Sequence, residues 1–282
     1  MVSPWTTGET TLCVDIRKTG AEQASSAADQ RVTRRSTAAV ESLTIDCGVD
    51  RSFAPQCVDV EPEAYKLHRS VQAVGRMVTG STICSGVLLG NKTSTYFLTA
   101  ASCLSCDSRV ESVQIELMNC IGSQVFTPSE LVHVNRQLDF AVLRLATRGF
   151  NIAGHFGFLL LRPSGPAKDE AVLVPHYTAS SAKRITAAND QGPVRVQRPN
   201  AGTTGCSSTN DEVPMSRVQF QAAQLDDTAV GAPVISAHDY SVVALQLCGG
   251  CKTRETNMAV PTTSIVEDLL ATNHLIPSFI AA

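Results

Sequence analysis

The residues of this chain that are most obviously suited to chemistry are its cysteines, because a thiolate can bind a metal ion and two thiols can form a disulfide. The sequence holds ten cysteines, and two pairs have the Cys-x-x-Cys spacing used in zinc sites: Cys103 with Cys106, and Cys248 with Cys251. The two pairs lie much further apart along the chain than the pairs of a zinc ribbon. A high, even number of cysteines is typical of an oxidising compartment. We therefore expect disulfides, with no metal and no other cofactor.

A β-hairpin would position one of these disulfides. Two apolar, β-branched stretches, 82–89 and 95–100, flank a Gly-Asn-Lys turn, and this pattern predicts two antiparallel strands. Cys84 and Cys103 would lie near the far ends of the paired strands, where one disulfide can join them. Asn91 in the turn begins the sequon Asn-Lys-Thr, so the tip is either a glycosylation site or an ordinary turn asparagine.

Further strand-sized stretches lie on both sides of the hairpin. In the first half of the chain we expect a helical turn over 61–68 and strands over 70–78, 110–118, 123–134 and 139–145. In the second half we expect strands over 156–161, 171–175, 193–197, 215–223, 232–236 and 240–247. Short strands separated by polar turns are typical of β-barrels and sandwiches. Near the end of the chain, the capping-box spacing of Ser264 and Glu267 before an apolar repeat predicts a helix.

The hairpin resembles the centre of the N-terminal barrel of trypsin-like serine proteases, where a Cys-Ser-Gly strand precedes Leu-Thr-Ala-Ala-His-Cys. In that family the residue before the second cysteine is the catalytic histidine, and here it is Ser102. Asp139 begins Asp-Phe-Ala-Val-Leu-Arg-Leu, which is similar to the strand that starts with the family's catalytic aspartate. Gly231-Ala-Pro-Val resembles the stretch after the catalytic serine, which puts Val230 in the serine's place and Thr228 in the oxyanion loop.

These departures imply that the chain does not hydrolyse peptides. The trypsin-type mechanism needs a hydroxyl nucleophile, a base beside it and a carboxylate that orients the base. Ser102 has no group that titrates near neutral pH, and Val230 offers only methyl groups. Thr228 and Val230 are β-branched, which disfavours the torsions of a tight glycine-rich loop. Loss of triad members costs on the order of 10⁶ in kcat. None of the six histidines is identified as a replacement base: His68, His133, His155, His176, His238 and His274.

Within this family the chain is most similar to the lysyl endopeptidases, over residues 47–270. The likeness rests on the stretch from Val172 to Ile185 and on Val242-Val-Ala-Leu-Gln-Leu-Cys-Gly-Gly-Cys251. It implies substrate-binding positions at His176, Gly249, Gly250 and Glu255. Glu255 would either bind a lysine side chain or be a solvated neighbour of Arg254. The likeness also implies that Cys120 and one cysteine of the 248–251 pair bridge to Cys47 or Cys57, and it leaves Cys13, Cys106 and Cys206 without an assigned partner.

The fold that this resemblance implies is all-β: two six-stranded Greek-key β-barrels of the trypsin-like protease fold with a C-terminal α-helix. We expect an N-terminal extension over 1–46, a first barrel over 47–150, and a second barrel with the helix over 151–282. The extension is rich in Ser, Thr and Ala and contains Arg34-Arg35. That pair is either a processing site of a pro-region or a solvated basic turn.

Composition narrows the possible partners. A chain of 282 residues with 43% hydrophobic and 17% charged residues suits a globular protein. The net charge of -3 argues against nucleic acid, and no apolar run approaches the roughly 18 residues that cross a membrane. We expect a secreted, extracellular protein that binds a protein partner without catalysis: a protease inhibitor, a protease or a substrate-like protein. Two alternatives stay open, an active serine-type endopeptidase or hydrolase with a rearranged site, and a structural extracellular module.

Overall fold

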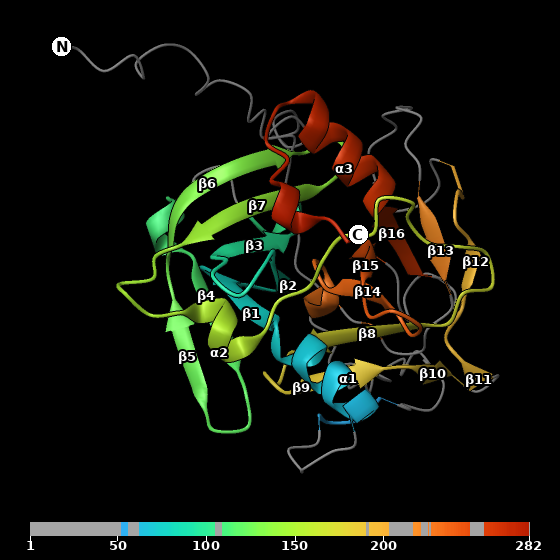
Figure 1. Cartoon of the computed structure of the whole chain (residues 1–282), viewed down its shortest axis with the longest axis horizontal. Coiled ribbons are helices and arrows are strands. Elements are labelled where there is room, and N and C mark those ends of the chain that lie inside the picture. The colour runs from blue at the N-terminus through green and yellow to red at the C-terminus, as the bar shows by residue number, and fades with distance from the viewer. Residues whose placement is uncertain are drawn as a thin grey trace, which may run out of the picture. The chain divides into compact units, whose positions relative to one another are not determined.

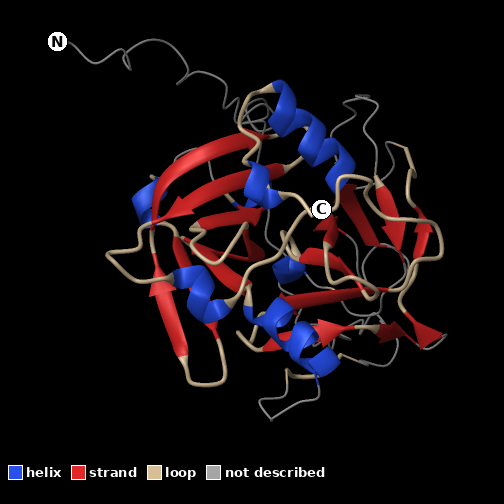
Figure 2. Ribbon diagram, in the orientation of Figure 1, coloured by secondary structure: helices blue, strands red, loops and turns tan. Residues whose placement is uncertain are grey.

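The structure, a computed structural model, describes residues 52–55, 62–104, 109–189, 192–202, 217–220, 225, 227–248 and 257–281. All of them belong to one compact unit, Ile45–Ala282. The other unit, Met1–Thr44, lies outside the described residues, and so do Arg34-Arg35 and the predicted boundary at residue 46. Strands predominate over helices in the described part (Figure 2).

The first half of the unit forms one antiparallel seven-stranded sheet that curls on itself (Figure 1). Its order is β5-β4-β1-β2-β3-β7-β6. The strands are β1 (Val74–Thr79), β2 (Thr82–Leu89), β3 (Tyr96–Thr99), β4 (Gln114–Met118), β5 (Ser123–Phe126), β6 (Pro128–Asn135) and β7 (Phe140–Leu145). Because β4 returns to lie beside β1, the run β4-β1-β2-β3 is a Greek key. The hairpin expected from the sequence is present, as β2 paired with β3.

The strand expected over 123–134 is two strands, which explains why the sheet has seven strands rather than the predicted six. β5 pairs with β4 and β6 pairs with β7, at opposite edges of the sheet. Only Thr127 separates the two strands, so these edges must approach each other and the sheet closes towards a barrel. Pro128 has no N–H to give to a ladder, and it stands at the first position of β6, where a strand tolerates proline.

The second half forms another antiparallel seven-stranded sheet, in the order β12-β13-β16-β15-β14-β8-β9. Its strands are β8 (Val172–Tyr177), β9 (Lys183–Thr186), β12 (Val196–Arg198), β13 (Val218–Phe220), β14 (Pro233–Ser236), β15 (Val242–Cys248) and β16 (Asn257–Pro261). A separate two-stranded sheet joins β10 (Ala188–Asn189) and β11 (Gly192–Pro193). The fold is therefore mostly β, with the two-barrel organisation that the family resemblance implied.

The connection between the two sheets is paired with both of them. The expected strand over 156–161 is instead the end of α2 (Ile152–Phe156), which Asn151 caps by accepting from the Gly154 N–H, followed by isolated bridges. Leu159 bridges to Leu89 of β2, and Leu161 bridges to Val242 of β15.

Helix α1 (Pro62–Gln72) is longer than the helical turn expected there, and it includes residues that we expected in the first strand. Ser70 bonds back to the Lys66 carbonyl as helical serines do, and β1 begins only at Val74.

The C-terminal helix is α3 (Thr262–Ala271). It begins before Ser264, so the capping box predicted from Ser264 and Glu267 does not form. Its N-cap is Pro261 without a side-chain cap, and the Thr262 hydroxyl donates to the Val243 carbonyl at 3.0 Å instead. The apolar face of α3 is buried through Ile265, Val266 and Leu269, whereas Leu270, expected on that face, is 59% exposed.

Among the described residues, two buried clusters hold the unit together. The larger runs from the first sheet to the ends of β14, β15 and α3, and includes Val87, Phe97, Phe140, Leu245 and Phe279. The smaller fills the second sheet with mostly small aliphatic residues around Phe220. Among the described residues, no helix has the length and apolar character needed to cross a membrane.

Candidate functional site

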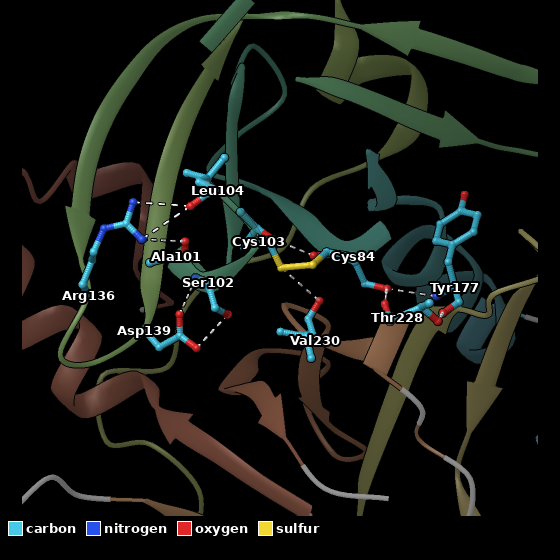
Figure 3. The surroundings of a disulfide bond; sticks show 12 residues. Cys84, Ala101, Ser102, Cys103, Leu104, Arg136, Asp139, Tyr177, Thr228 and Val230 are labelled. Carbon is cyan, nitrogen blue, oxygen red and sulfur yellow. Dashed lines mark hydrogen bonds between the residues drawn. A yellow bond between two sulfur atoms is a disulfide. The ribbon is translucent and has the colours of Figure 1, made fainter. Parts of the chain in front are cut away.

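The first part of the site is Ser102 on a single 3₁₀ turn, Ala101–Cys103, directly after β3 (Figure 3). Its backbone N–H donates to Asp139 Oδ1 at 2.6 Å, and its hydroxyl donates to Asp139 Oδ2 at 3.0 Å. One serine therefore engages both oxygens of the carboxylate. Asp139 precedes β7 in a left-handed backbone conformation, with φ of 63°, which aspartate adopts more readily than most residues.

Two arginines fix the loop that carries Asp139. The Arg136 guanidinium donates to the carbonyls of Ala101 and Leu104, on either side of Ser102 (Figure 3). Arg217 donates to the Leu138 carbonyl at 3.3 Å. Burial lowers the pKa of Arg217, and the charge of Asp139 opposes that effect.

The second part of the site is the loop Asp227–Gly231, which begins with a 3₁₀ turn over Asp227–Ala229. The Ser85 N–H donates to the Val230 carbonyl at 2.9 Å, and the Ser85 hydroxyl donates to the Thr228 carbonyl at 2.9 Å. The Thr228 hydroxyl donates in turn to the Tyr177 carbonyl at 2.7 Å. Residues of β2 and β8 thus fix this loop by main-chain and side-chain bonds.

Gly231 ends this loop where the backbone of β2 passes closest. Its φ is 82°, and a Cβ at this position would lie 2.3 Å from the Ser85 carbonyl oxygen and 2.9 Å from the Ala100 nitrogen. Only glycine fits both the conformation and the space. The loop can therefore approach the first sheet closely.

A cleft of about 360 Å³ lies between the Ser102 turn and the Asp227–Gly231 loop. Ser102 and Val230 both line it, and the disulfide Cys84–Cys103 forms part of its floor, with the Cys103 sulfur 3.9 Å from the Val230 carbonyl oxygen. Ser102 and Val230 therefore face the same cleft, and Asp139 is joined to Ser102 by hydrogen bonds. Among the described residues that line the cleft, the polar side chains are hydroxyls and the carboxylate of Asp227.

Other predicted site residues lie elsewhere. His176 is 1% exposed on β8, its Nδ1 is 3.0 Å from the Val174 carbonyl, and it does not line this cleft. Gly249, Gly250 and Glu255 lie outside the described residues. Asn91 is exposed at the tip of the β2–β3 hairpin, where its Oδ1 accepts from Thr93; whether it is glycosylated stays a prediction.

All six histidines fall within the described residues. In that part of the chain, the hydrogen bonds shown to the Asp139 carboxylate come from Ser102, through its N–H and its hydroxyl. The histidine nearest to it in sequence, His133, instead meets Asp268 of α3 at 2.6 Å.

The cysteines of the described residues are all in disulfides. Cys84 and Cys103 form the pair expected from the hairpin, with Cα atoms 6.2 Å apart. Cys120 and Cys248 are disulfide-bonded too. The structure shows no group of three or more potential metal ligands in the described ranges.

Sequence reasoning missed Ser85 and Arg217. Ser85 is the middle residue of the Cys-Ser-Gly motif, so the motif marked its position but not its bonds to Thr228 and Tyr177. Arg217 follows a long polar loop and carries no local signal.

These geometric features have a parallel among known proteins. The model of the trypsin-like peptidase domain matches residues 84–245, more than half of the chain, so the chain belongs to this family. Its sequence is 30% identical over 241 residues to Secreted RxLR effector protein 73 of Plasmopara viticola. That match covers 79% of this chain and 54% of the relative, so the chain spans about half the length of the curated relative it matches.

Solved structures share the fold. The active form of the Rv3671c protease of M. tuberculosis has a TM-score of 0.54 at 14% identity, over 89% of this chain and 96% of that one. The MamO protease domain of Magnetospirillum magneticum has a TM-score of 0.53 at 18% identity, over 72% and 98%. A serine endoprotease of Yersinia pestis has a TM-score of 0.52 at 15% identity, over 77% and 68%. At such low identities the likeness concerns the fold alone.

Proposed function

We propose that this chain is a secreted trypsin-fold protein without proteolytic activity, which binds a protein partner through the cleft between its two sheets. The observation that carries this proposal is the Ser102–Asp139 pair. Both oxygens of the Asp139 carboxylate accept from Ser102, by its N–H at 2.6 Å and its hydroxyl at 3.0 Å. In an active relative this carboxylate would orient an imidazole.

The chemistry of the cleft supports inactivity over an enzyme with a rearranged site. Ser102 could act as a nucleophile only if Asp139 took its proton, and a carboxylate is a much weaker base than an imidazole. The Thr228 hydroxyl already donates to the Tyr177 carbonyl at 2.7 Å. Val230 supplies methyl groups where the family resemblance places the nucleophile.

The shape of the cleft supports a protein as the partner. The cleft of about 360 Å³ lies between the Ser102 turn, after β3, and the Asp227–Gly231 loop, before β14. A reactive loop of a protease inhibitor, or a substrate-like segment, has the form to enter it. Secretion is supported by the disulfides and by the name of the Plasmopara viticola relative, which describes a secreted effector.

A paired assay tests inactivity. The full chain is treated with a fluorophosphonate probe and separately with lysine-containing peptides, with an active trypsin-family enzyme as positive control. Lysine peptides are chosen because the sequence resembles lysyl endopeptidases, an affinity that stays a prediction. We expect neither labelling nor turnover. Labelling of a serine or threonine together with peptide cleavage would refute the proposal and favour an active hydrolase with a rearranged site.

A binding measurement tests the second half of the proposal. Serine-protease inhibitor proteins are titrated onto the immobilised full chain by surface plasmon resonance. We expect saturable binding that Thr82→Trp, at the exposed rim of the cleft, weakens at least about tenfold. The matched variant Ser123→Trp, on the exposed edge strand β5, should bind as the parent does. Equal binding by the two variants, or none by the parent, would favour a structural module.

A further inference from the structure

A second cavity opens between α1, β4 and β9, and its described lining residues are different from those of the cleft. Its volume is about 210 Å³. Val71 of α1 and Met118 of β4 form apolar walls, and Ala54 and Cys120, which both line it, are exposed, so the cavity is open to solvent. For scale, an engineered apolar cavity of about 150 Å³ holds benzene.

A single amine lies at the inner end of this cavity. Lys183, at the start of β9, is only 6% exposed. Its Nζ donates to the Val71 carbonyl at 3.1 Å and to the Met118 carbonyl at 3.0 Å, and it lies 5.3 Å from the centre of the Tyr177 ring. Two acceptors match the two N–H bonds of a neutral amine, whereas an ammonium group has three donors. In the neutral form the remaining position on the nitrogen carries the lone pair, beside the Tyr177 ring and the cavity.

The charges around Lys183 do little to hold it protonated. Glu116 on β4 is the carboxylate that acts on it, but Glu116 already pairs with Arg76 of β1 at 3.1 Å. His68 of α1 lines the cavity, and Tyr177 of β8 presents its ring. Burial lowers the pKa of Lys183 to about 7, against the charge of Glu116, which raises it.

This pKa makes the neutral form abundant. About half of such an amine is unprotonated at pH 7, against on the order of one part in 10³ for an ordinary lysine. Desolvation in an apolar pocket is a recognised way to make a lysine nucleophilic.

We propose that Lys183 is a nucleophilic amine that forms an imine with a small apolar aldehyde entering this cavity. The lone pair of Nζ attacks the carbonyl carbon, a C–N bond forms, and the carbonyl oxygen takes up a proton to give a carbinolamine. The C–O bond then breaks and the oxygen leaves as water, carrying two hydrogens that were on the nitrogen. A C=N bond remains, and no oxidant or reductant takes part. If the imine is protonated, its one N–H can donate to Val71 or Met118.

Reductive trapping tests this site in the full chain. The protein is incubated with benzaldehyde and sodium cyanoborohydride between pH 6 and 9, and labelled peptides are quantified by mass spectrometry. We expect Lys183 to be labelled at least about tenfold faster at pH 7 than the exposed lysines Lys66, Lys92 and Lys168, with a ratio that falls from pH 7 to 9 as the exposed lysines gain their neutral form. Equal or slower labelling of Lys183 would overturn the proposal.

Matched variants separate the cavity from general reactivity. Ala54→Trp at the mouth should slow labelling of Lys183 at least about tenfold and leave the exposed lysines unchanged, while Ser123→Trp should change neither. Pyrene-1-carboxaldehyde, which is too large for the cavity, should show no preference for Lys183. Equal labelling of Lys183 in the parent and in Ala54→Trp, together with an equal preference for Lys183 by the two aldehydes, would contradict the role of the cavity. The comparison of the two aldehydes uses the parent protein, so it needs no substitution at Lys183.

Discussion

Placing the family's two catalytic side chains in this chain, by Ser102→His with Val230→Ser, should give a poor protease. The reason is the loop that would have to form the oxyanion hole. Thr228 is held from two sides, by its own hydroxyl on the Tyr177 carbonyl at 2.7 Å and by the Ser85 hydroxyl on its carbonyl at 2.9 Å. A β-branched residue in this position also resists the torsions that a glycine would adopt.

The size of the effect follows from these bonds. Each hydrogen bond contributes roughly 0.5–1.5 kcal/mol, so about 1–3 kcal/mol opposes rearrangement of the loop. Failure to present one oxyanion donor costs about 10²–10³ in kcat. The double variant should therefore remain at least about 10²-fold below an active relative. Adding Thr228→Gly removes one bond and the β-branch, and should raise activity at least about tenfold above the double variant.

The assay is kcat/KM on a fluorogenic lysine-containing peptide, with Ser102→Ala plus Val230→Ser as the matched background. Turnover of the double variant at the level of an active family member would refute the account of the loop. So would a triple variant that is no faster than the double.

Three further outcomes are expected. Gly231→Ala should lower the free energy of unfolding by at least about 2 kcal/mol, because its Cβ would meet the Ser85 carbonyl; a denaturant midpoint like that of the parent would contradict this. Lys183, with a pKa lowered to about 7 in the folded state, binds less proton than the unfolded chain between about pH 7 and 10.5. The stability of the parent relative to Lys183→Met should therefore rise with pH across that range and be lowest below pH 7. Burial raises the pKa of Glu170, but hydrogen bonds, first that from Arg162, lower it overall. The parent should hence lose more stability than Glu170→Gln as the pH falls below about 4.5. Parallel profiles of stability against pH for these two proteins would show that the Arg162–Glu170 interaction does not stabilise the fold.

The parts of the fold that the sequence predicted are those with local causes. The β2–β3 hairpin follows from two β-branched stretches around one turn, and its disulfide follows from where Cys84 and Cys103 fall on it. The division of the expected strand at Thr127 has only one local signal, Pro128 at the start of β6. It arises because β5 and β6 pair with strands at opposite edges, and only closure of the sheet brings those edges together.

The features of the candidate site also divide into those that the sequence predicted and those that it did not. Motifs singled out Ser102, Asp139 and Val230; in the structure Ser102 and Val230 line one cleft, and Asp139 is hydrogen-bonded to Ser102. The bonds that give the site its character join residues far apart in the chain, such as Ser85 with Thr228, and no spacing predicts them. Lys183 was part of a stretch noted only for its family likeness, because the burial of its amine depends on α1 and β4.

The paired connection between the two sheets affects how a partner would bind in the cleft. The Leu159 N–H donates to the Leu88 carbonyl at 2.9 Å, and the Val242 N–H donates to the Leu160 carbonyl at 2.8 Å. The stretch 159–161 is therefore hydrogen-bonded to both sheets. A hinge motion in this connection would have to break these backbone hydrogen bonds before the two sheets could separate. The width of the cleft between the sheets is therefore fixed before binding, and a rigid loop of matching shape would bind with little loss of conformational entropy.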